Sequence, residues 1–154
     1  QPRREMSPGL ARQVLEGGYW LHPPEPGAEL AIVCAGALAP EALEALAAIR
    51  EDIPGAGLLH VTSADRLDMD WRRRGREGVA AGLLAPLAAD AALVTVIDGH
   101  PTTLSWLGAV LGHRVRALGV DRFGQSADLV DLYRVHGLNV GGILDACAAA
   151  VLRS

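Results

Sequence analysis

The sequence contains no lysine, two cysteines and no long uninterrupted apolar run. All 14 basic residues are arginine, and 18 acidic residues bring the formal net charge to −4. A negative balance argues against a general nucleic-acid-binding protein. No uncharged apolar stretch approaches the ~18 residues of a membrane-spanning helix, and no signal-peptide pattern follows the charged start. We therefore expect neither a nucleic-acid partner nor a membrane partner.

Both cysteines lie in apolar segments, Cys34 in the first half of the chain and Cys147 near its end. This placement favours buried, reduced thiols in a cytoplasmic protein over a disulfide framework. Neither cysteine belongs to a paired motif with metal-binding spacing, so we expect no metal site. The chain begins at Gln1 and without methionine. We therefore expect a processed product or a piece of a longer protein.

Length and composition favour one compact domain preceded by an arm. The chain has 154 residues, of which 50% are hydrophobic. Residues 1–28 hold five of the nine prolines and show little apolar periodicity. We interpret 1–28 as a Pro-rich linker or arm and 29–154 as the domain.

Apolar runs and helical stripes alternate after residue 29, which predicts an α/β fold. Residues 30–35, 58–62 and 92–98 are typical of buried strands, and residues 113–119 alternate like a strand nearer an edge. Helices are predicted from Pro40, over 79–89, around 104–111, over 127–136 and from Asn139. The polar segment 64–78 predicts a short helical turn followed by an exposed loop. Together these elements predict a three-layer α/β domain with a mostly parallel sheet of about five strands and helices on both faces.

Ligands of open α/β sheets collect at the carboxyl ends of the strands. Asp98, His100 and Thr102 follow the clearest predicted strand. An acid, an imidazole and a hydroxyl at one strand end can bind a polar ligand or move a proton. Alternatively, Asp98 or Thr102 caps the next helix and His100 lies at the surface or an interface.

The segment 121–126 forms a second candidate site, with Phe123, Gly124 and Ser126. Ser126 precedes a predicted helix, where free backbone N–H groups can hold an anion. Asp128 in the first turn would repel that anion, so capping is the favoured interpretation. After the first strand, Gly36 fits a strand-to-helix turn but not the spaced glycine fingerprint of dinucleotide sites.

The segment 65–78 carries clustered arginines beside a tryptophan: Trp71, Arg72, Arg73 and Arg74. Tryptophan and arginine are enriched in the hot spots of protein interfaces, which makes this cluster a candidate docking site. Equally, it could be a solvated loop lying on another domain of the same polypeptide. No nucleophile motif and no phosphate-binding loop appears, so we assign no catalytic residue.

The order of these pieces, with the run 119–126 (Gly-Val-Asp-Arg-Phe-Gly-Gln-Ser), resembles the C-terminal domain of the transketolase superfamily. A Gly-x-Asp-x-Phe-Gly-x-Ser run makes it most similar to the homodimeric pyruvate dehydrogenase first component. Val-Thr-Ser at 61–63 and Glu-Gly-Gly-Tyr at 16–19 add to the resemblance. These enzymes use thiamine diphosphate and Mg²⁺, which the resemblance implies for a parent enzyme.

The resemblance carries no catalytic residue onto this chain. Family members hold the cofactor with a Gly-Asp-Gly…Asn motif and an essential Glu in two other domains, and 97–99 (Ile-Asp-Gly) does not match that motif. The resemblance instead implies that this domain contacts other domains of the same enzyme, organises a homodimer and docks to an acyltransferase core. Alone, such a domain is expected to lack catalysis. The alternative is a stand-alone α/β module that binds a small anionic ligand or a protein partner.

Overall fold

A computed structural model describes residues 5–121 and 129–152 of the chain. Its centre is a five-stranded sheet in the order β1-β3-β2-β4-β5. The strands are β1 (Gly18–His22), β2 (Ala28–Ala35), β3 (Gly57–Val61), β4 (Leu87–Ile97) and β5 (Arg114–Leu118). Strands β2 to β5 are mutually parallel, and β1 joins β3 in antiparallel register. The predicted fold class and the four predicted strands are therefore confirmed.

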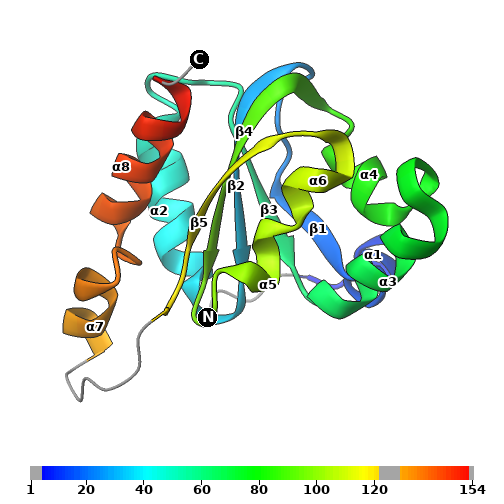
Figure 1. Ribbon diagram of the computed structural model, residues 1–154, viewed down its shortest axis with the longest axis horizontal. Helices are drawn as coiled ribbons and strands as arrows, with labels where there is room; N and C mark the ends of the chain where they lie inside the picture. Colours follow the sequence, from blue (N-terminus) through cyan, green and yellow to red (C-terminus); the bar gives the residue numbers. More distant parts are fainter. Residues whose placement is uncertain (1–4, 122–128, 153–154) are drawn as a thin grey trace.

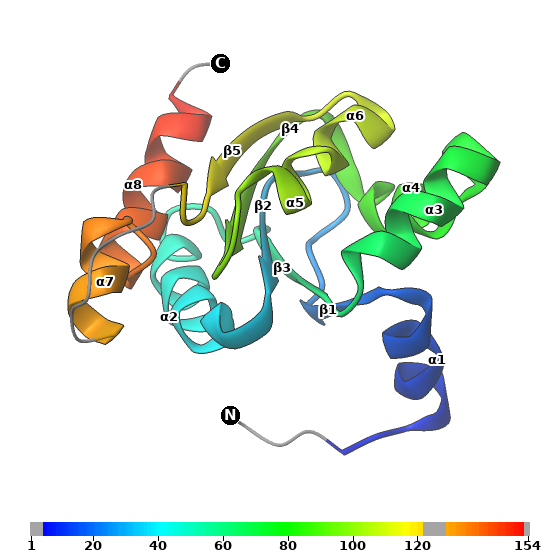
Figure 2. The same cartoon turned by 60° about the horizontal axis from the view of Figure 1, so that its bottom comes forward.

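Helices cover both faces of this sheet (Figures 1 and 2). One face carries α2 (Ala39–Ile49), α7 (Leu129–Val135) and α8 (Val140–Val151), and the other carries α3 (Ala64–Arg74), α4 (Val79–Leu84), α5 (Thr102–Ser105) and α6 (Leu107–Leu111). The 3₁₀ turns η1 (Gly36–Leu38) and η2 (Gly75–Glu77) lead into α2 and α4. Within the ranges that the model describes, no helix is both long and apolar enough to cross a membrane.

The sheet separates two hydrophobic cores, because successive side chains of each strand point to opposite faces. Along β2, Ile32 and Cys34 point toward α2 and α8, whereas Ala31 and Val33 point toward α3, α4 and α6. All four are fully buried, which explains the continuous apolar run in this central strand. Cys147 on α8 belongs to the same core as Cys34, and neither thiol forms a disulfide.

The structure differs from the expected boundary at residue 29. Segment 1–28 contributes helix α1 (Pro8–Glu16) and the edge strand β1. The Gly17 carbonyl accepts hydrogen bonds from the backbone N–H groups of Thr62 and Ser63, at 2.9 and 3.1 Å, which ties the start of β1 to the end of β3. The sheet therefore begins at residue 18, and the Pro-rich stretch 23–27 connects β1 to β2.

Three predicted elements are corrected. Residues 64–74 form the regular helix α3, so a short turn with an exposed loop is wrong for most of 64–78. The helix predicted over 79–89 ends at Leu84, and β4 begins at Leu87, directly after Pro86. The helix around 104–111 is divided into α5 and α6 at Trp106. The helices from Pro40 and from Asn139 are confirmed.

Candidate functional site

The chain changes sheet faces between β2 and β4. After β2 it enters α2 on one face, and after β4 it enters α5 on the other. Such a switch point is where parallel α/β sheets bind ligands, at the carboxyl edge. At Gly36, which takes a left-handed φ of +68°, the backbone leaves β2 for α2. This edge carries the candidate residues of the β4–α5 turn.

The β4–α5 turn is held by His100 and Thr102. The His100 Nδ1 lies 2.7 Å from the Thr102 hydroxyl and accepts a hydrogen bond from the Thr102 backbone N–H at 3.3 Å. An Nδ1 that accepts from the backbone leaves the imidazole proton on Nε2, so we assign the Nε2–H tautomer. Both residues are exposed. His100 thus stabilises the start of α5 through these contacts. The sequence analysis had assigned such a structural role to Asp98 or Thr102 as an alternative to ligand binding.

Asp98 acts electrostatically on α7. Burial is the main cause that raises the pKa of the half-buried Tyr133, and the charges of Asp98 and Glu41 raise it further. Among the described residues, Glu41 Oε2 is buried and has no hydrogen-bond partner. The hydrogen bonds that link His100 to Thr102 do not include Asp98.

Helix α3 forms in a strongly polar sequence because its ends and side-chain pairs favour it. The Ser63 hydroxyl accepts from the Arg66 backbone N–H and caps the first turn, while three arginines occupy the last turn, where the helix dipole favours cations. Two ion pairs at (i, i+4) spacing, Asp68–Arg72 at 2.7 Å and Asp70–Arg74 at 3.5 Å, add support.

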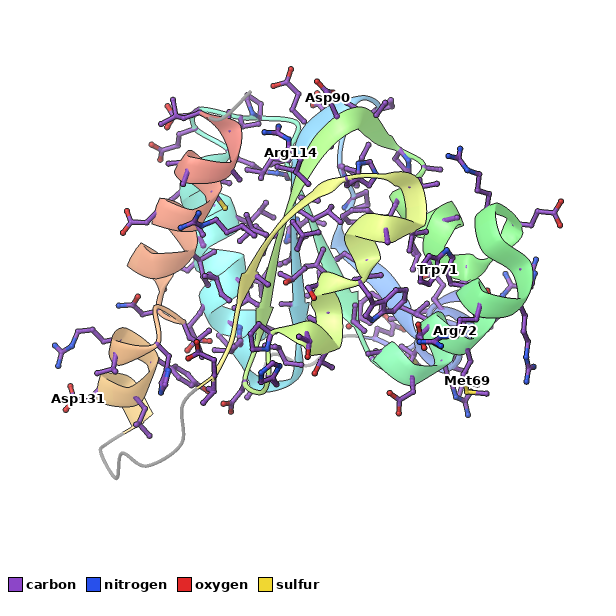
Figure 3. The ribbon with its side chains drawn as sticks, viewed as in Figure 1. Met69, Trp71, Arg72, Asp90, Arg114 and Asp131 are labelled. Atoms are coloured by element: carbon purple, nitrogen blue, oxygen red, sulfur yellow. The ribbon has the colours of Figure 1, made fainter. Side chains whose placement is uncertain are left out.

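Trp71 packs against another element of its own domain. Its ring stacks on Trp106, with ring centroids 5.5 Å apart and an interplanar angle of 21°. Trp106 also donates its indole N–H to the Thr103 carbonyl at 2.9 Å. The two half-buried tryptophans therefore join α3 to the junction of α5 and α6. Trp71 is labelled on α3 in Figure 3.

A cleft of about 370 Å³ opens between α3 and α5 beside the tryptophan stack, and we call it the α3–α5 cleft. Its polar lining consists of Asp65, Asp68, Arg72, Thr102, Thr103 and Trp106. Arg72 is already paired with Asp68, so the lining carries a net charge of −1 from two carboxylates and one guanidinium. The cleft suits a neutral, hydroxyl-rich or cationic group better than an anion.

The cleft unites two sets of residues that the sequence proposed separately. Arg72 comes from the docking cluster and Thr102 from the strand-end turn. Arg73 and Arg74 are exposed and lie outside this lining. Phe123, Gly124 and Ser126 lie outside the described residues, so the second candidate site stays a prediction.

The described residues do not fit the cofactor that the resemblance implies. Mg²⁺ prefers oxygen ligands from carboxylates grouped in one place. No group of three or more His, Cys, Asp or Glu side chains is arranged to hold a metal ion in residues 5–121 and 129–152. Asp98 is exposed and forms no ion pair with a described residue.

The sequence analysis did not identify Glu41 and Tyr133 as residues of the switch point. It also did not identify Trp106 as the partner that stacks on Trp71. Glu41 stands in the first turn of the helix after β2, so its position at the carboxyl edge was a usable signal. Tyr133 reaches the same edge through α7, whose packing the sequence did not specify. Trp106 stands at the break between α5 and α6, and periodicity predicted no break there.

These features define a three-layer α/β domain with one antiparallel edge strand and a polar cleft at its carboxyl edge. Transketolases are among the solved structures with a similar fold. A transketolase from Leishmania mexicana matches with a TM-score of 0.70 and 20% identity, over 92% of this chain and 19% of that chain. A transketolase from Campylobacter jejuni matches with a TM-score of 0.64 and 15% identity, over 87% and 18%. A structure described as a split gene transketolase, inactive beta4 tetramer, matches with a TM-score of 0.60 and 18% identity, over 89% and 43%.

The match shows the fold of the C-terminal domain of transketolases. The chain spans about a fifth of the length of the transketolases from Leishmania mexicana and Campylobacter jejuni. No protein-family model matches the chain, and no curated protein matches it in sequence.

Proposed function

We propose that this chain is the C-terminal domain of a larger thiamine-diphosphate-dependent enzyme, which supports its other domains and lacks turnover by itself. The observation that carries this proposal is the asymmetry of the structural match, which covers 92% of this chain but 19% of a transketolase. We assign cofactor binding to domains outside this chain, as the resemblance implies.

The similar split-gene structure supports the same division of labour. That structure is described as a split gene transketolase, inactive beta4 tetramer. A chain whose match covers 43% of it is expected to be inactive alone as well. In this chain, Cys34 and Cys147 are buried free thiols, which agrees with a reducing compartment such as the cytoplasm.

Two kinds of parent enzyme fit the proposal. The run 119–126 favours the pyruvate dehydrogenase first component, in which this domain would organise a homodimer and dock an acyltransferase core. The transketolase fold is equally compatible with a transketolase proper, a transferase. The exposed Arg73 and Arg74 and the rim of the α3–α5 cleft are the surfaces we propose for contact with other domains or partners.

Calorimetry tests the central claim. We expect no heat of binding when thiamine diphosphate and Mg²⁺ are titrated into the chain, whereas a complete transketolase in the same buffer gives a saturable isotherm. Stoichiometric binding by the chain alone would refute the proposal. The reading frame gives a second test, because an upstream Gly-Asp-Gly…Asn motif is expected there.

A stand-alone binding module is the second candidate, and the α3–α5 cleft is the observation in its favour. The excess of carboxylates in the lining disfavours the small anionic ligand and leaves a protein partner. A reading frame with an initiator methionine directly before residue 1 would support this module.

A further inference from the structure

Strand β5 ends the sheet, and its outer edge has no strand beside it in the part of the chain that the structure describes. Its recorded pairing is with β4 alone, from Ala92 opposite Arg114 to Val96 opposite Leu118. Alternate backbone N–H and C=O groups of such a strand point outward and can pair with another chain. Figures 1 and 2 show β5 at the front of the sheet between α6 and α8.

A groove lies beside the first half of β5, between this strand, β4 and the last turns of α8. It has a volume of about 340 Å³ and is lined by Ala92, Arg114, Val115, Arg116, Ala149 and Ala150. The small alanines of α8 leave room beside the strand. Arg114 and Arg116 share a strand face because they are two residues apart, and both are exposed.

The two arginines differ in how their charge is compensated. Arg114 donates hydrogen bonds to the backbone carbonyls of Ala150 and Asp90, at 3.2 and 3.3 Å, so it ties α8 to the start of β4 (Figure 3). A neighbouring hollow of about 140 Å³ places the carboxylates of Glu29 and Asp90 near Arg114. Arg116 has no carboxylate within ion-pair distance among the described residues. The middle of the edge therefore carries the uncompensated positive charge.

Charge decides which strand this edge accepts. A second copy of the chain paired through β5 would bring arginine close to arginine, and like charges facing each other across strands are destabilising. An extended segment with Glu or Asp opposite Arg116 would gain both the backbone ladder and an ion pair. Val115 and Ala117, on the other face of β5, are half-buried and leave an apolar strip for a β-branched side chain.

From this edge, groove and charge we infer that β5 is a docking site for an extended acidic segment of a partner protein, which adds to the sheet as a sixth strand. The inference is independent of the proposed function, because it uses no cofactor and no other domain of the parent enzyme. It also concerns a different side of the molecule from the α3–α5 cleft.

The test uses the full chain and a labelled synthetic peptide that alternates valine with glutamate. Fluorescence anisotropy should show saturable binding, and hydrogen exchange should show new protection of the amides of 114–118. A second peptide keeps the sequence but carries N-methyl groups on alternate backbone nitrogens, which removes strand pairing and leaves the charge. A third peptide replaces glutamate with lysine. Neither should bind detectably.

Charge reversal in the chain supplies the matched comparison. Arg116→Glu should weaken binding of the acidic peptide by at least about tenfold. Arg12→Glu makes the same charge change on the exposed helix α1 and should leave binding within about twofold. No binding by the acidic peptide, equal binding by its N-methyl form, or equal losses in the two variants would overturn the inference. If the acidic peptide does not bind, Arg114 and Arg116 serve only to prevent two copies of β5 from pairing with each other.

Discussion

The tryptophan stack between α3 and α6 gives a prediction that separates packing from surface charge. Replacing Trp71 with Ala removes a half-buried ring that lies 5.5 Å from the ring of Trp106. A stacked aromatic pair contributes about 0.5–1.5 kcal/mol beyond its buried area, and truncating a fully buried Trp costs about 3–5 kcal/mol. For a half-buried ring we expect the free energy of unfolding to fall by about 2 kcal/mol.

The control removes charge from the same helix and leaves the stack intact. The triple variant with Arg72, Arg73 and Arg74 changed to Ala loses two exposed (i, i+4) ion pairs, whose arginine side chains are 73% and 55% exposed. Such pairs contribute about 0.3–0.5 kcal/mol each, so the loss should stay near about 1 kcal/mol.

Urea unfolding followed by far-ultraviolet circular dichroism measures both variants and Trp71→Phe, which should recover about half of the loss. The reasoning fails if Trp71→Ala unfolds at the wild-type midpoint. It also fails if the arginine triple is the more damaging change.

Burial raises the pKa of both Cys34 and Cys147 to about 12, so neither thiol should react with Ellman's reagent until the chain is unfolded in urea; labelling of the native protein would contradict this. Burial also lowers the pKa of His113 below its ordinary value of 6.5, so the unfolded chain gains a proton first as pH falls. The contribution of His113 to the free energy of unfolding should therefore be complete above about pH 6.5 and be lost below it. In His113→Gln, the unfolding midpoint should vary less with pH between about pH 5 and 7. An unchanged pH slope would show that another group is responsible. Gly17 has a φ of +116°, and a Cβ there would lie 2.8 Å from a backbone oxygen, so Gly17→Ala should cost about 1–3 kcal/mol. The matched change Gly9→Ala, in the exposed helix α1 with no close neighbour, should be neutral or stabilising, and equal effects of the two substitutions would rule out the strain.

The buried strands were predictable from sequence because a parallel strand covered on both faces must be apolar throughout. The run at 30–35 falls within β2, and the run at 92–98 covers most of the second half of β4. Strand β1 escaped detection for the opposite reason. It lies at an edge, its residues are largely half-buried, and prolines follow it directly. Its partner β3, not its own pattern, determines that it is a strand.

The candidate site was only partly accessible to sequence reasoning. Helix α3 has few apolar residues, so hydrophobic periodicity could not extend it beyond a turn, although the cap at Ser63 and the spacing from Asp68 to Arg72 were visible signals. That Arg72 and Thr102 share one cleft follows from the crossover after β3, which returns to the far side of β2. Contacts across such a crossover depend on tertiary packing, and no single-sequence pattern contains them.

The reversed direction of β1 has a practical consequence for how the protein is handled. Gly18 sits opposite Val61, so the N-terminal segment leaves the body where β2, β3 and β4 finish. The last helix runs the other way (Figure 1), and the Ala150 carbonyl near its end accepts a hydrogen bond from Arg114, at the start of β5. Helix α1 is joined to the start of α3 by hydrogen bonds from Thr62 and Arg66, so it lies on the side of the α3–α5 cleft. A fluorophore attached to α1 will therefore report on that cleft, and one attached to the last turn of α8 will report on the β5 groove.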